Sequence, residues 1–134
     1  MDALSIQAAL QEYFAPWVQD LGLRVESLGE STVTLRLPLN DKLSRVGGML
    51  CGQAMMAGAD TAVALALIQH FGQFRPCTTV QMNTSFLRPL SNQDALIDAR
   101  VLRAGKSLAF AEIDIRGATD GKSVSRSSAT YALL

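Results

Sequence analysis

The segment from Met49 to Phe71 constrains this chain more than any other, because it is long, almost wholly apolar and interrupted by one charge. With His70 neutral, Asp60 carries the only formal charge in these residues. The pattern predicts a helix over about residues 51–70, closed by Gly72. A helix that is apolar on every side must be covered on every side, so we expect a core helix wrapped by other elements.

The same segment could be mistaken for a membrane-spanning helix. However, the segment is rich in alanine and glycine rather than in strongly apolar residues. In addition, a central aspartate costs roughly 2.5–3.5 kcal/mol in a bilayer. The N-terminal residues lack the basic region and apolar core of a secretion signal. We therefore expect a cytoplasmic protein with no membrane partner, in which Cys51 and Cys77 stay reduced.

Composition excludes two further classes of protein. The chain has 134 residues, of which 49% are hydrophobic and 18% charged, and this composition is typical of a folded domain rather than a disordered one. The net charge is zero, so the basic excess of a nucleic-acid-binding surface is missing. We expect one domain over residues 1–134 and no nucleic-acid partner.

The rest of the chain predicts a helix followed mainly by strands. Helical spacing covers residues 3–20, and Gly29 separates two strand-like segments. The predicted strands cover residues 24–30, 32–39, 78–87, 95–103, 107–116 and 122–133. Adjacent strands joined by short turns indicate a mainly antiparallel sheet and an α+β fold. One sheet curling around the long helix, with a second copy of the chain covering the remainder, would bury every side of that helix.

Asp60 has no charge partner on its own helix. Its neighbours three and four residues away are Met56, Ala57, Val63 and Ala64. An unpaired carboxylate in apolar surroundings is costly, so another element or a solvated cleft must compensate it. One interpretation is structural, with hydrogen bonds from nearby strands and a contribution from Thr61. The other is functional, with the carboxylate acting as general base or nucleophile in an apolar cleft.

Three glycines precede Asp60 at the expected start of the helix, namely Gly47, Gly48 and Gly52. Glycines here either turn the chain or expose backbone N–H groups that can stabilise an oxyanion. Gly52 and Asp60 are eight residues apart, about 12 Å along a helix. One carbonyl group cannot contact both, so a joint role requires two subunits and predicts an obligate homodimer with composite sites.

The segment G-G-M-L-C-G-Q-A-M-M-A-G-A-D-T-A (47–62) resembles the helix-start motif of hotdog-fold acyl-CoA thioesterases of the phenylacetate-pathway type. In that motif, two residues separate Asn from Gly, and two residues separate this Gly from His-Gly-Gly. An Asp then follows the last Gly by seven residues. The segments T-V-Q-M-N-T-S-F-L-R-P (79–89) and G-K-S-L-A-F (105–110) also resemble that family. The resemblance implies a curled antiparallel sheet around a central helix, a homodimer or homotetramer, and acyl-CoA hydrolysis without a metal or redox cofactor.

The resemblance also implies roles for individual residues. Asp60 would act as general base or nucleophile, the Gly52 N–H would hold the thioester carbonyl, and Thr79 would orient the water or the carboxylate. The chain departs from the family at Arg45, Cys51 and Gln53, which stand where the family has Asn, His and the second Gly. These departures predict a slower reaction, another substrate, or a transfer of the missing roles to other groups.

Further candidates for substrate binding surround this motif. Arg45, Cys51 and Gln53 would contact the substrate, with Cys51 a small lining residue rather than a nucleophile. Met56 is either a core residue or part of an acyl tunnel.

Cations at loop ends could bind the coenzyme A phosphates or could be ordinary solvated charges: Arg88, Arg103 and Lys106. One alternative function is a non-catalytic acyl-CoA-binding protein. Another is a hydratase, but its usual catalytic histidine could only be His70, at the far end of the helix.

Overall fold

The computed structural model describes residues 1–134. It contains three α-helices, one short 3-10 helix and eight strands. In chain order they are α1 (Ala3–Tyr13), α2 (Pro16–Gln19), β1 (Arg24–Leu28), β2 (Thr32–Leu37), η1 (Asp41–Leu43), β3 (Ser44–Arg45), β4 (Met49–Leu50), α3 (Gly52–Phe71), β5 (Cys77–Phe86), β6 (Ala95–Ala104), β7 (Leu108–Gly117) and β8 (Ser123–Leu133).

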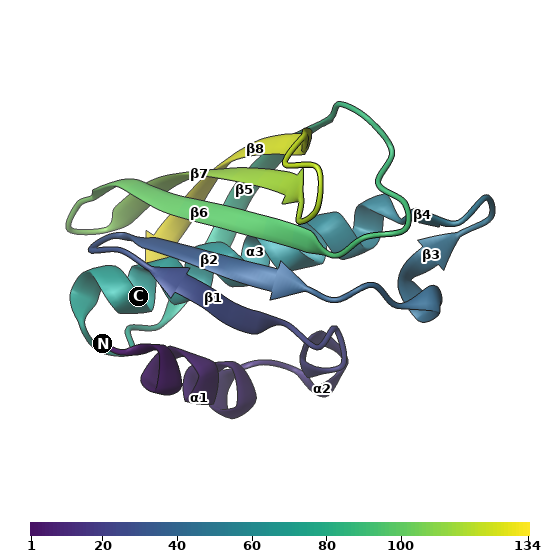
Figure 1. Ribbon diagram of the computed structural model, residues 1–134. Helices are drawn as coiled ribbons and strands as arrows, with labels where there is room; N and C mark the ends of the chain where they lie inside the picture. Colours follow the sequence, from purple (N-terminus) through teal and green to yellow (C-terminus); the bar gives the residue numbers. More distant parts are fainter.

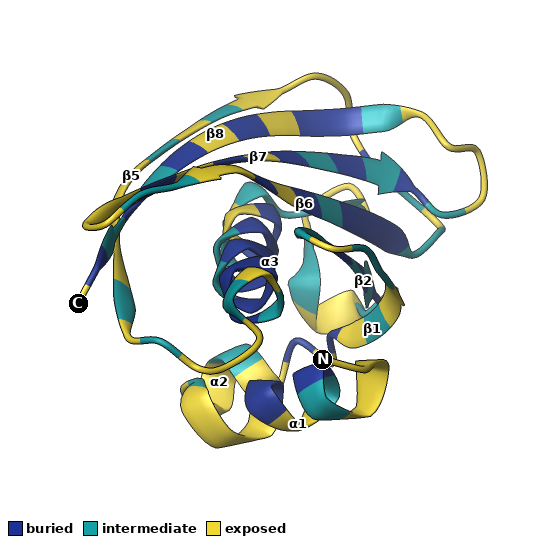
Figure 2. Ribbon diagram, turned by 90° about the vertical axis from the view of Figure 1, so that its left-hand side faces the viewer, coloured by how far each residue is buried: buried dark blue, intermediate teal, exposed yellow.

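Six strands form one antiparallel sheet in the order β1-β2-β6-β7-β8-β5. The sheet curls over α3, as Figures 1 and 2 show, while α1 and α2 lie on the opposite side of that helix. This is the predicted α+β hotdog arrangement, in which one long central helix is wrapped by a curled sheet. The last strand, β5, pairs only with β8 and forms one edge of the sheet.

The central helix α3 begins after Cys51 and ends at Gly72, whose left-handed conformation (φ 73°) closes the last turn. By length and composition α3 could cross a membrane, but 61% of its most apolar window is buried inside the fold. Gly58 allows the helix to approach β6, because a Cβ at this position would lie 2.5 Å from Ile97 Cδ1. The apolar character of α3 is therefore explained by its place in the core.

Alternating side chains attach the sheet to this core. Val33, Leu35 and Leu37 on β2 are at most 1% exposed, and they belong to a buried cluster of 29 residues. The alternation that predicts this strand thus also predicts which of its faces is buried. The predicted strand boundaries differ from the observed ones by one or two residues.

Two expectations for the loops and the N-terminal helix were wrong. The single helix over residues 3–20 is broken, because Pro16 lacks a backbone N–H and the preceding Ala15 is extended (ψ 150°). The loop before α3 contains an unexpected two-stranded hairpin, β3–β4. Gly47 (φ 101°) and Gly48 (φ 80°) form its turn. Of the three glycines, only Gly52 therefore lies at the helix N-terminus.

Candidate active site

Asp60 lies on the least buried side of α3 and is itself half-buried. This side runs along the helix at spacings of three and four residues, through Gln53, Met56, Ala57, Asp60 and Ala64, none of which is fully buried. The remaining sides of the helix pack against the sheet and against α1. The sequence therefore places its one helical carboxylate where the fold leaves the helix partly uncovered.

Two hydroxyl groups from the sheet compensate the Asp60 carboxylate. Thr79 on β5 donates from Oγ1 to Asp60 Oδ1 at 2.7 Å. Tyr131 on the neighbouring β8 donates to the same oxygen, and its hydroxyl lies 3.1 Å from the Asp60 carbonyl oxygen. Thr61 does not contribute, since its hydroxyl bonds the carbonyl of Ala57. Oδ2 accepts no hydrogen bond from the chain, so one carboxylate oxygen is fixed and the other is free.

Burial and the charge of Asp60 keep the two acidic groups beside it, Tyr131 and Cys77, in their neutral forms. Tyr131 is 2% exposed, and burial, followed by its bond to Asp60, raises the pKa of its phenol. The phenol therefore stays protonated and keeps donating over the whole range in which enzymes are assayed. Burial also raises the pKa of the Cys77 thiol, and the charge of Asp60 raises it further. Cys77 is thus a neutral neighbour of the carboxylate.

Gly52 is the first residue of α3, and its N–H belongs to the uncapped first turn. Cys51, at the N-cap, accepts no hydrogen bond with its side chain. The ring of Phe86 covers Gly52, because a Cβ there would lie 3.2 Å from Phe86 Cζ. Phe86 itself is 52% exposed. The start of the helix is therefore a place where a carbonyl oxygen could approach unpaired N–H donors beside an aromatic ring.

A cleft of about 510 Å³ opens beside Gly52. It brings together three residues proposed from the sequence, Arg45, Gly52 and Arg88, with Phe86 and Met49 in its lining. Two guanidinium groups at an otherwise apolar cleft could hold an anionic group such as a phosphate.

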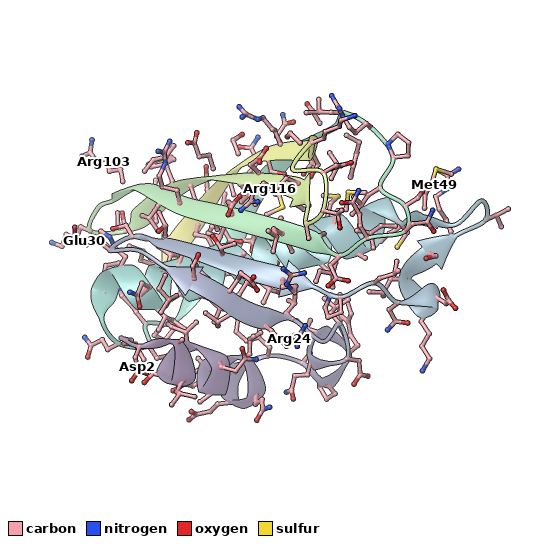
Figure 3. All side chains as sticks on the ribbon, viewed as in Figure 1. Asp2, Arg24, Glu30, Met49, Arg103 and Arg116 are labelled. Carbon is pink, nitrogen blue, oxygen red and sulfur yellow. The ribbon has the colours of Figure 1, made fainter.

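The other proposed contact residues lie elsewhere. Cys51 and Gln53 line a separate hollow of about 260 Å³ beside Trp17. Met56 is 38% exposed on the same side of α3 as Asp60, one turn before it. Arg103 and Lys106 lie at the β6–β7 turn, and Figure 3 shows Arg103 at the end of the molecule opposite Met49. Within one chain, the seven residues proposed to bind substrate are therefore not gathered in one place.

His70 is exposed in the last turn of α3, where its Nδ1 lies 2.8 Å from Ser31 Oγ. It is ten residues from Asp60, about 15 Å along the helix. This position fits a polar group near a helix C-terminus and gives no support to a hydratase that combines histidine with an acid.

Sequence reasoning missed Tyr131 and Phe86. The alternation of β8 places Tyr131 on the inner face of the sheet, and a lone phenol on that face was the available signal. Its register opposite Thr79 depends on strand pairing, which local sequence does not reveal. Phe86 lies within a segment used for the family resemblance, but its packing on Gly52 depends on β5 running back along α3.

Comparison with known proteins fits this geometry. Residues 47–124 match the model of the thioesterase superfamily. A protein of Thermoplasma volcanium, provisionally named an esterase, is 32% identical over 110 residues, covering 81% of this chain and 80% of the relative.

Two solved structures share the fold. The zebrafish thioesterase superfamily member 2 has a TM-score of 0.88 at 22% identity, over 100% of this chain and 99% of that one. A mutant thioesterase from Pseudomonas aeruginosa has a TM-score of 0.86 at 23% identity, over 100% and 94%. The chain, with its hotdog fold, therefore belongs to the thioesterase superfamily.

Proposed function

We propose that this protein is a homodimeric acyl-CoA thioesterase, similar to those of the phenylacetate-pathway type. The observation that carries the proposal is the Asp60 carboxylate. It lies on the open side of an apolar helix, with Oδ1 fixed by Thr79 and Tyr131 and Oδ2 free. If the carboxylate served only to join α3 to the sheet, we would expect both of its oxygens to be hydrogen-bonded to the chain.

The free oxygen can act in either of two ways. As a general base, Oδ2 takes a proton from water, and the water oxygen adds to the thioester carbonyl carbon. As a nucleophile, Oδ2 attacks that carbon itself and water hydrolyses the resulting anhydride. In both cases the C–S bond breaks, the thiol leaves with a proton, and a carboxylic acid remains. Thr79 and Tyr131 hold the carboxylate in place and are not consumed.

Stabilisation of the oxyanion requires the second subunit. Asp60 and Gly52 of one α3 are about 12 Å apart along the helix, so one thioester cannot reach both. The open side of α3 lies beside β5, a ten-residue edge strand with one unpaired edge. A second copy joined antiparallel at this edge would place its Gly52 opposite Asp60. This arrangement completes two equivalent sites per dimer.

The same arrangement would bring the separated cations together at one binding site. In an antiparallel pair, the Arg45 and Arg88 cleft of one copy faces the end of the other copy that carries Arg103 and Lys106. Four cations from two chains would then surround the phosphates of one coenzyme A. The free state of Cys51 and Cys77 fits a reducing compartment such as the cytoplasm.

A panel of acyl-CoA substrates with short, medium, long and aryl acyl groups tests the proposal, with released thiol as the readout. We expect turnover that falls at least about 100-fold in Asp60→Asn, the usual scale for loss of a general base. Glu30→Gln makes the same chemical change at an exposed site and should leave turnover intact. Binding of acyl-CoA without turnover would instead favour a non-catalytic binding protein, the alternative raised by Arg45, Cys51 and Gln53.

A further inference from the structure

A second hollow lies on the other side of Asp60 from Gly52. It has a volume of about 210 Å³, and six of its eight lining residues are hydrophobic. Ala64 and Ile68 of α3 form one wall, and Cys77 of β5 lies across from them. The one charged residue, Arg75, is engaged elsewhere: its guanidinium donates to the Lys106 carbonyl at 3.0 Å and lies 5.0 Å from the Phe71 ring centroid.

This hollow adjoins the surroundings of Asp60 through two of its lining residues, Ala64 and Cys77. Ala64 follows Asp60 by one helical turn on the same side of α3. Cys77 precedes Thr79 by two residues on the inner face of β5. Its thiol is close enough to Asp60 for the charge of the carboxylate to raise the pKa of the thiol. A group attached to a carbonyl at Asp60 therefore has an apolar space directly beside it.

Two stacked aromatic rings close the far end. Tyr13, the last residue of α1, stacks on Phe74 with ring centroids 3.9 Å apart and planes 8° from parallel. Phe74 belongs to the segment between α3 and β5. Both rings line the hollow, and their side chains are 43% and 45% exposed, so the pair lies between the hollow and solvent.

We propose that this hollow binds the acyl group and that the Tyr13–Phe74 pair limits its length. The inference rests on the proposed thioesterase function, whose substrate class it specifies. Apolar cavities of about 150 Å³ accept benzene, so this hollow suits one aromatic ring or a chain of about six carbons. The cleft at Gly52, with Arg45 and Arg88, suits the charged part of a thioester instead.

Chain-length profiles of variants test the limit. In the wild type, kcat/KM should be highest for phenylacetyl- or hexanoyl-CoA and fall for dodecanoyl-CoA. Phe74→Ala removes one ring of the wall, and the ratio of dodecanoyl to hexanoyl kcat/KM should rise about tenfold or more, since each newly buried methylene strengthens binding about fourfold. Phe110→Ala is the matched control, because Phe110 is similarly exposed (40%) on the outer face of the sheet. Unchanged profiles in Phe74→Ala would overturn the proposal.

A binding measurement separates this proposal from the catalytic one. In a Cys51→Ser variant, Cys77 is the only thiol, and its modification by methyl methanethiosulfonate can be followed by mass spectrometry. A hexanoyl-CoA analogue with CH₂ in place of the thioester sulfur should slow the modification at least about fivefold, whereas coenzyme A alone should not. If no acyl-CoA is hydrolysed but the analogue protects Cys77, the catalytic proposal fails and the acyl pocket stands. If the analogue gives no protection, the acyl pocket is wrong whatever the turnover.

Discussion

At the scale of single residues, the central fact is that one oxygen of Asp60 receives two hydrogen bonds from two different strands. Hydrogen bonds to a charged group contribute about 1.5–3 kcal/mol each. Both donors favour the ionised carboxylate, and both fix the direction of its free oxygen. Thr79 and Tyr131 are therefore expected to support the reaction through Asp60 rather than by contact with the substrate.

Replacing either donor should slow the reaction with little effect on substrate binding. Thr79→Val and Tyr131→Phe should each lower kcat about 10- to 100-fold with little change in KM, matching the loss of one bond to a charge.

The neighbouring threonine provides the control. Thr78→Val removes the same hydroxyl from an exposed position one residue away, on the outer face of β5, and should leave kcat unchanged. A Thr79→Val enzyme with the kcat of the wild type would show that the hydroxyl does not act on Asp60.

The same residues mark how far the sequence predicts the site. A lone acid in an apolar helix draws attention to Asp60 from local sequence, and the family resemblance adds Gly52 and Thr79. Tyr131 follows Asp60 by 71 residues and becomes its neighbour only because β8 lies between β7 and β5. Such a contact depends on strand order, which neither periodicity nor composition specifies.

At the scale of elements, the close approach of α3 to β6 depends on Gly58. A Cβ at this position would meet the end of the Ile97 side chain, which is fully buried. Gly58→Val should lower the free energy of unfolding by about 1–3 kcal/mol through overpacking. Gly58→Ala should cost less than Gly58→Val, because the Ile97 terminus can turn away from a single methyl group and the helix gains about 1 kcal/mol of propensity. Urea unfolding of both variants checks this, and equal stability of Gly58→Val and wild type would show that the contact is loose.

The elements themselves were predictable where one face is buried. Alternation indicates β2, and the apolar run closed by Gly72 indicates α3, because burial imposes a period on each. The prediction failed where backbone chemistry outweighs burial, namely at Pro16 and in the β3–β4 hairpin. Helical spacing continues across Pro16, but proline cannot continue the hydrogen-bond ladder.

At the scale of the whole molecule, one edge of the sheet is unpaired and the side of α3 next to it is partly uncovered. The open side of α3 adjoins β5, whose bulge between Thr79 and Gln81 leaves Val80 60% exposed at the unpaired edge. Long unpaired edges with exposed apolar residues promote association. Under the proposed function, the separation of Gly52 and Asp60 along α3 would make this assembly a condition of activity, because neither half of the proposed site is complete alone.

A charge at this edge should therefore abolish both assembly and turnover. Val80→Asp is expected to give a folded monomer by sedimentation velocity, with kcat/KM lowered at least about 100-fold because the oxyanion donor is lost. Leu102→Asp is a close match, since Leu102 is 54% exposed and lies at the bulge of β6, away from the edge. It should remain an active dimer. Mixing Val80→Asp with an excess of Asp60→Asn should not restore activity, because the edge of one partner remains charged. A stable monomer with wild-type turnover would rule out the shared site and would require Asp60 to act without the partner's Gly52.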